Sequence, residues 1–204
     1  MVDHVLLRRL LSILRDRETP HGGFRQTLDE AAMILAYEAM RTLRPADLEV
    51  QTPLEPAAGV RLADQVVIVA ILRAGLGMVD GFLRLVPDAR VGHLGMYRDE
   101  EALRPVGYYE NVPPGVDEAE VFVVDPMLAT GGSATQAIAR LKRAGARRLR
   151  FVCLVAAPEG VAALQEAHPD VPIFTATVDR QLDDNGYIRP GLGDAGDRIF
   201  GTDS

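Results

Sequence analysis

Short apolar runs alternate with segments of helical apolar spacing along the last two-thirds of the chain. Runs at residues 66–72, 91–97, 121–124, 149–155 and 171–176 predict strands, and residues 76–85, 134–144 and 160–168 predict helices. Strands without polar alternation are typical of a sheet covered on both faces, and alternation with helices favours right-handed parallel crossovers. We therefore expect an α/β fold, a mainly parallel sheet flanked by helices, in one domain spanning residues 1–204.

Two amphipathic helices are expected ahead of this sheet. Leucines recur at helical spacing between residues 6 and 14, and a second apolar stripe runs from Phe24 to Leu43, just before Pro45. Both helices belong either to the core or to a subunit interface. Between residues 45 and 65 apolar and polar residues alternate until Pro56 and Gly59 break the pattern, which predicts an edge strand or hairpin.

The charge balance restricts the partners that the surface can bind. The chain carries a net charge of −7, which argues against a general nucleic-acid-binding or anionic-membrane surface. No apolar stretch reaches the roughly 18 residues of a membrane span. The only cysteine, Cys153, lies in an apolar run. We expect a soluble cytoplasmic protein with a buried structural thiol.

The segment V-F-V-V-D-P-M-L-A-T-G-G-S, residues 121–133, joins a predicted strand to a predicted helix. Its two glycines permit a tight turn, so that main-chain N–H groups can converge at the positive end of the helix dipole and hold a phosphate. Thr130 and Ser133 add hydroxyls, and Asp125 can accept hydrogen bonds from sugar hydroxyls or hold a hydrated cation. The alternative is a tight connection without a ligand. The spacings of nucleoside-triphosphate and dinucleotide loops are absent.

Two arginines follow other predicted strands. Arg73 precedes Ala-Gly-Leu-Gly, and Arg98 ends the next apolar run. Loop arginines are often surface charges, but carboxyl ends of neighbouring strands meet at one edge of the sheet, which favours a shared pyrophosphate. Residues 98–120 lack sustained apolar periodicity, which indicates either a lid or an ordinary exposed hairpin.

Residues 125–133 resemble the phosphoribosyl-pyrophosphate (PRPP) signature of type I phosphoribosyltransferases. Most of these enzymes carry two adjacent acids, whereas Pro126 occupies the second position here, as in the uracil phosphoribosyltransferases. Residues 71–78, 95–98 and 186–202 resemble further segments of that family. The resemblance covers nearly the whole chain, and implies a Rossmann-like fold with a flexible loop and a small hood from residues 45–65 and 177–204.

The resemblance also implies a reaction and its site: uracil and PRPP give UMP and pyrophosphate, with Mg²⁺ carried by PRPP rather than bound by protein side chains. The implied PRPP-binding residues are Arg73, Arg98, Asp125, Pro126, Met127, Leu128, Ala129, Thr130, Gly131, Gly132, Ser133 and Asp194. The implied uracil-binding residues are Ile188, Gly193, Asp194 and Ala195, with Asp194 and Arg98 as catalytic residues. Glycines in this C-terminal tail expose main-chain groups that can complement uracil, although a Gly/Pro-rich coil is the plain alternative. A homodimer or homotetramer, and GTP as an activator, are further expectations.

Two other functions stay open at this point. A phosphoribosyltransferase for a purine or for orotate is disfavoured by Pro126 and the glycine-rich tail. A PRPP-sensing RNA-binding regulator is disfavoured by the acidic charge and by an aromatic content of 5%. We expect Asp194 to orient PRPP rather than to remove a proton, and we leave Arg25, a helix arginine, outside the site.

Overall fold

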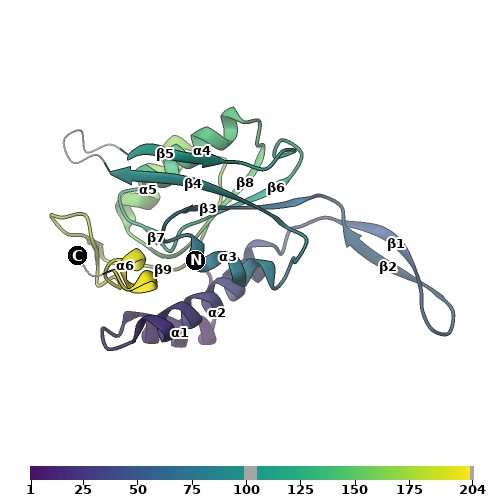
Figure 1. Cartoon of the computed structure of the whole chain (residues 1–204), viewed down its shortest axis with the longest axis horizontal. Coiled ribbons are helices and arrows are strands. Elements are labelled where there is room, and N and C mark those ends of the chain that lie inside the picture. The colour runs from purple at the N-terminus through teal and green to yellow at the C-terminus, as the bar shows by residue number, and fades with distance from the viewer. Residues whose placement is uncertain (99–104, 203–204) are drawn as a thin grey trace.

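The computed structural model describes residues 1–98 and 105–202, which form a helix-flanked sheet (Figure 1). Within these residues seven strands make the central sheet: β3 (Val66–Leu72), β4 (Arg90–Arg98), β5 (Pro105–Asn111), β6 (Glu120–Val124), β7 (Met127–Leu128), β8 (Arg148–Ala156) and β9 (Ile173–Val178). All neighbouring strands are parallel except β4 and β5. The predicted α/β fold with a mainly parallel sheet is confirmed.

Helices cover both faces of the sheet. The helices are α1 (Val5–Arg15), α2 (His21–Ala39), α3 (Leu76–Leu83), α4 (Gly132–Arg143), α5 (Pro158–Ala167) and α6 (Ala195–Phe200). Ile68 and Ala70 of β3 pack into a core with α1, α2, α3 and α6, whereas Val67 and Val69 pack into a second core with α4. Because both faces of β3 are buried, the strand is apolar at every position.

Both N-terminal helices form as predicted, and only the end of the second differs from expectation. The leucines of α1 at 7, 10, 11 and 14 are buried inside the chain's own core, so they are core residues. The helix α2 ends at Ala39, although the apolar stripe continues to Leu43. The chain turns after Met40 and enters β1 at Pro45, where a proline would end a helix in any case.

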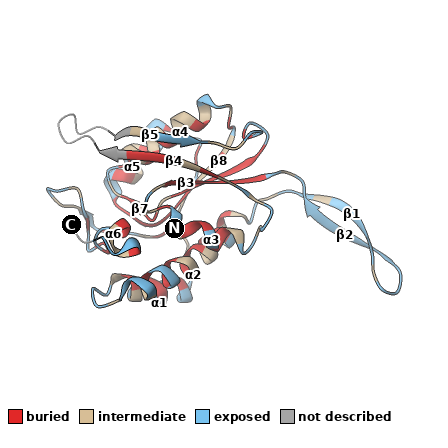
Figure 2. Ribbon diagram, in the orientation of Figure 1, coloured by how far each residue is buried: buried red, intermediate tan, exposed pale blue. Residues whose placement is uncertain are grey.

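A hairpin of β1 (Pro45–Gln51) and β2 (Pro56–Leu62) extends from the body of the molecule (Figure 1). It contacts solvent along most of its length, as the pale blue of Figure 2 shows. A second, short pair, β10 (Gln181–Leu182) with β11 (Ile188–Arg189), lies at the opposite end. The two segments expected to share a hood therefore lie far apart in this arrangement.

The interval between β4 and β6 contains the edge strand β5, antiparallel to β4. Tyr108 and Tyr109 of β5 are exposed, which explains why the sequence showed no buried periodicity there. Residues 99–104 of the expected lid lie outside the described residues. Cys153 is buried as expected, and this burial raises the pKa of its thiol to about 12. Within residues 1–98 and 105–202, no helix has the length and apolar character to span a membrane.

Candidate functional site

The connection from β7 to α4 has the geometry of a phosphate cradle, residues 129–133. Gly131 precedes α4 with φ of +83°, a left-handed conformation that favours glycine. The N-cap residue Gly131 has no side chain to cap this helix, and the N–H of Gly132 makes only a long contact, 3.5 Å, with Thr130 Oγ1. An anion can therefore accept from the N–H groups at this helix start. Gly160 of α5 packs directly behind the cradle: a Cβ there would lie 2.3 Å from the carbonyl oxygen of Ala129. Gly160 was not among the site residues predicted from the sequence.

A cavity of about 490 Å³ joins the cradle to the C-terminal tail. Its walls are Met127, Ala129, Thr130 and Ser133 on one side, and Asn185, Gly186, Tyr187, Ile188, Gly193, Asp194 and Ala195 on the other. The two segments expected to hold PRPP and uracil are thus brought together, although about 50 residues separate them in the sequence. The expected site residues Pro126 and Leu128 are buried beneath this surface. Three further lining residues were not predicted as site residues, Asn185, Gly186 and Tyr187, which directly precede the expected uracil-binding residue Ile188.

Asp125 and Pro126 have distinct roles at the end of β6. The half-buried carboxylate of Asp125 accepts a hydrogen bond from the main-chain N–H of Met127 at 3.4 Å. Burial is the main cause that raises the pKa of Asp125 to about 7, and the negative charge of Asp194 adds to it. Such a carboxyl favours sugar hydroxyls or a cation as partners. The carbonyl oxygen of Pro126 accepts from the N–H groups of Leu154 and Val155, both at 3.0 Å, so Pro126 shapes the backbone.

Arg73 follows β3 in a loop that has no space for side chains at Gly75. A Cβ at Gly75 would lie 2.5 Å from the carbonyl oxygen of Val124. The side chain of Arg73 is 54% exposed and points to the tail: its Nη2 lies 3.3 Å from Asp197 Oδ1. Its guanidinium also lies 5.7 Å from the ring centroid of Phe200. This arginine therefore lies between the sheet edge and α6, with its charge still accessible to an anion.

Arg98 ends β4, three residues beyond Gly95, which pairs with Leu72 of β3. The backbone thus brings Arg98 to the sheet edge where Arg73 leaves β3. The structure does not describe the side chain of Arg98, and its role in PRPP binding remains a prediction.

The tail is an ordered part of the core rather than a coil. Ile188, Leu192, Ala195 and Ile199 are buried in the core that contains α1 and α2. Gly193 has φ of +77° and is exposed at the cavity wall.

The carboxylate of Asp194 accepts from the N–H of Asp197 at 2.9 Å and so caps α6. Arg25, left outside the site, donates to the carbonyl oxygen of Ile199 at 2.8 Å and supports the tail from α2. Among the described residues, no group of three or more His, Cys, Asp or Glu side chains could hold a metal ion.

Comparison with known proteins agrees with this geometry. The family model for uracil phosphoribosyltransferase matches residues 1–202. A uracil phosphoribosyltransferase of Salinibacter ruber is 63% identical over 202 residues, which is 99% of this chain and 96% of the relative. One from Streptococcus pneumoniae is 57% identical over 203 residues, covering 99% and 97%. The solved structure of the AQ2163 protein from Aquifex aeolicus has a TM-score of 0.94 at 38% identity, covering 98% of this chain and 96% of that chain. The chain belongs to the uracil phosphoribosyltransferase family.

Proposed function

We propose that this protein transfers the 5-phosphoribosyl group of PRPP to N1 of uracil, forming UMP and pyrophosphate. The observation that carries this proposal is the cavity in which a phosphate cradle faces a wall of exposed main-chain groups, in a chain of this family. The same cavity provides no argument for RNA, for a purine or for orotate.

The PRPP half of the site lies at the carboxyl edge of the sheet. The cradle, residues 129–133, holds the 5′-phosphate through the N–H groups at the start of α4, and Asp125 binds the ribose hydroxyls. Arg73 and Arg98 stabilise the departing pyrophosphate. Because the ribose becomes positive as pyrophosphate leaves, the protein contributes alignment and charge neutralisation, and no protein nucleophile is required.

The uracil half is formed by the tail. Ile188 offers an apolar surface, and the main-chain groups of Gly193, Asp194 and Ala195 complement the donors and acceptors of the base. Asp194 caps α6 and faces the PRPP side, so we assign it to orientation.

The family implies Mg²⁺, and two carboxyl groups suit an ion that enters with PRPP: Asp194 in the cavity wall and Asp125, which precedes that wall at the end of β6. Burial raises the pKa of Asp125 and so favours its neutral form. A nearby cation would lower this pKa and favour the charged carboxylate. Asp125 and Asp194 would face the ion, whose chemistry is to neutralise the pyrophosphate charge.

We also propose that the protein is a homodimer or homotetramer in the cytoplasm and that GTP activates it. The hairpin supports self-association, since Leu48, Val50, Val60 and Leu62 expose apolar surface on a two-stranded arm that packs little against its own chain. An isolated hairpin is marginally stable in water, so a covering surface would stabilise it.

The deciding experiment is a product assay with radiolabelled uracil and PRPP, with and without Mg²⁺. We expect UMP in the presence of Mg²⁺, and little product when orotate, hypoxanthine or adenine replaces uracil. If no UMP forms under either condition, the proposed reaction is wrong. Faster turnover of another base would show that this base, and not uracil, is the preferred substrate.

A further inference from the structure

Three main-chain groups that directly precede Gly193 are each held by a charged side chain. The N–H of Gly191 donates to Asp179 Oδ2 at 2.9 Å, and its carbonyl oxygen accepts from Arg15 Nη1 at 3.0 Å. The carbonyl oxygen of Leu192 accepts from Arg198 Nη1 at 2.9 Å. None of these three side chains lines the cavity. They therefore bind the backbone of residues 191 and 192 without contacting the cavity.

Arg15 and Asp179 form a two-pronged ion pair that is largely removed from water. Arg15 Nη1 and Nη2 lie 2.9 and 2.5 Å from the two carboxylate oxygens, and the side chains are 24% and 4% exposed. A buried ion pair contributes little net stability, because desolvation offsets the attraction between the charges. The pair instead fixes the position of one residue, Gly191, because Arg15 donates to its carbonyl oxygen and Asp179 accepts from its N–H.

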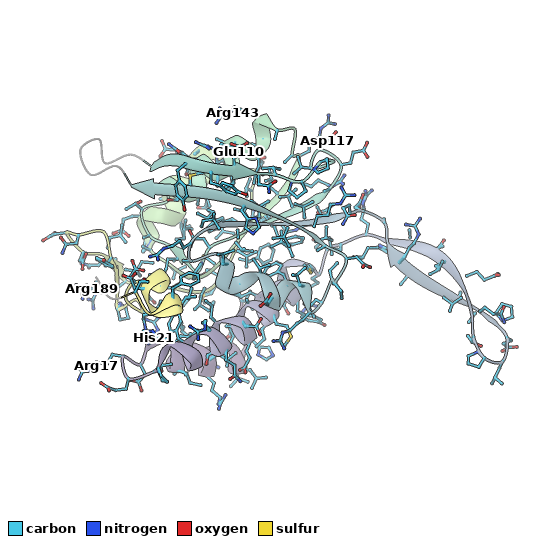
Figure 3. The ribbon with its side chains drawn as sticks, in the orientation of Figure 1. Arg17, His21, Glu110, Asp117, Arg143 and Arg189 are labelled. Carbon is cyan, nitrogen blue, oxygen red and sulfur yellow. The ribbon has the colours of Figure 1, made fainter. Side chains whose placement is uncertain are left out.

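Arg198 also connects the end of α1 to the tail, through hydrogen bonds to main-chain carbonyl oxygens. Besides Leu192, it donates to the carbonyl oxygens of Leu14 and, at 2.6 Å, of Asp16. Its guanidinium lies 4.4 Å from the ring centroid of Phe24 on α2. His21, which lies beside α6 in Figure 3, has its Nδ1 3.1 Å from the carbonyl oxygen of Arg198. The end of α1, residues 14–16, is therefore the platform for the tail.

We propose that Arg15, Asp179 and Arg198 are positioning residues for uracil recognition: by fixing the peptides of Gly191 and Leu192 they set how residues 193–195 face the base. This inference rests on the proposed function. The cradle and Asp125 lie on the connection between β6 and α4, outside the tail, so this part of the PRPP half stays in place when residues 191–195 loosen. Arg73 contacts the tail further on, at Asp197 and Phe200 of α6. A purely structural role would instead impair both substrates alike.

The test uses Asp179→Asn, which keeps the side-chain shape and one acceptor but removes the charge that orients Arg15. We expect the KM for uracil to rise about tenfold or more, as for loss of a charged hydrogen bond. The KM for PRPP should change by less than about threefold. Arg15→Lys is a second variant that keeps the charge; one ammonium cannot reproduce the fork to Asp179 and Gly191, so it should show a smaller rise in the same direction.

The matched control is Asp29→Asn, which changes another aspartate–arginine pair remote from the site, between Asp29 on α2 and Arg84 after α3 at 2.7 Å, with side chains 14% and 63% exposed. This variant should keep both KM values close to those of the unsubstituted protein. Hydrogen exchange gives a readout without turnover: in Asp179→Asn the amides of residues 188–196 should exchange at least about tenfold faster than before, with the cradle unchanged.

Equal increases in both KM values, or unchanged exchange in residues 188–196, would overturn the positioning role. An unsubstituted protein that forms no UMP would refute the proposed function, whereas the exchange result would still report on the scaffold. The two failures are therefore distinguishable.

Discussion

Asp125 carries the clearest electrostatic signature of the site. Burial raises its pKa from 3.8 to about 7, so the folded protein binds this proton more tightly than the unfolded chain. Between about pH 4 and pH 7 the unfolded chain loses the proton first, and the free energy of unfolding falls as the pH rises.

We expect Asp125→Asn to be more stable than the unsubstituted protein at pH 8, by on the order of 4 kcal/mol, because it removes the buried ionisation. The difference should disappear near pH 4, where both side chains are neutral. Thermal unfolding of both proteins at the two pH values measures this. A stability difference independent of pH would show that the carboxyl does not titrate as stated.

Asp194 combines a place in the cavity wall with a structural task, the cap of α6. Asparagine caps a helix as well as aspartate does, so Asp194→Asn should keep the stability and most of the turnover rate. Asp194→Ala should lose about 1 kcal/mol of stability through the missing cap. Rates measured across pH decide the role: a large rate loss in Asp194→Asn would assign a charge or proton-transfer role to Asp194.

At the scale of elements, the cradle depends on how closely α5 approaches it. Gly160→Ala would place a Cβ 2.3 Å from the carbonyl oxygen of Ala129, so the cradle backbone must shift. We expect the KM for PRPP to rise about tenfold or more, with a smaller effect on uracil.

Gly22→Ala is the matched control for this substitution, because a Cβ at Gly22 in α2 meets nothing within 4 Å. Alanine is the better helix former, so this variant should be unchanged in kinetics and more stable by roughly 0.5–1 kcal/mol. Normal PRPP kinetics in Gly160→Ala would mean that the cradle tolerates the shift.

The elements that sequence reasoning predicted well are those whose environment is uniform. The strand β3 matches its prediction because every position except the last is buried, and α4 follows its predicted range within two residues. The edge strand β5 was predicted only as part of one alternative, an exposed hairpin, since Tyr108 and Tyr109 are exposed and the local pattern is polar. Element ends such as that of α2 depend on the tertiary turn that follows.

The site was predictable only in part for a related reason. Short motifs identified the cradle and the tail, because their glycines and polar residues lie next to each other in the sequence. The supports of the tail were not, since Arg15 and Asp179 are 164 residues apart and nothing in the sequence indicates that they pair. Such contacts appear only when α1 and β9 are packed together.

At the scale of the whole molecule, the hairpin protrudes from the body and is exposed along most of its length (Figures 1 and 2). If a second copy covers it, Val60→Lys should shift the sedimentation of the protein toward a 22.1 kDa monomer. Val5→Lys, on α1, is the control, because Val5 is 67% exposed and Val60 68%. Sedimentation velocity at several concentrations measures both. A protein that sediments as a monomer without substitution would contradict the proposed self-association.

The cavity also links function to the order in which the chain is made. Its first wall comes from residues 127–133 and its second from residues 185–195, close to the C-terminal end of the sequence. During synthesis residues 127–133 leave the ribosome before residues 185–195, so the cradle is made before the wall that faces it. A chain that stops before residue 185 therefore keeps the cradle but lacks the opposite side of the cavity.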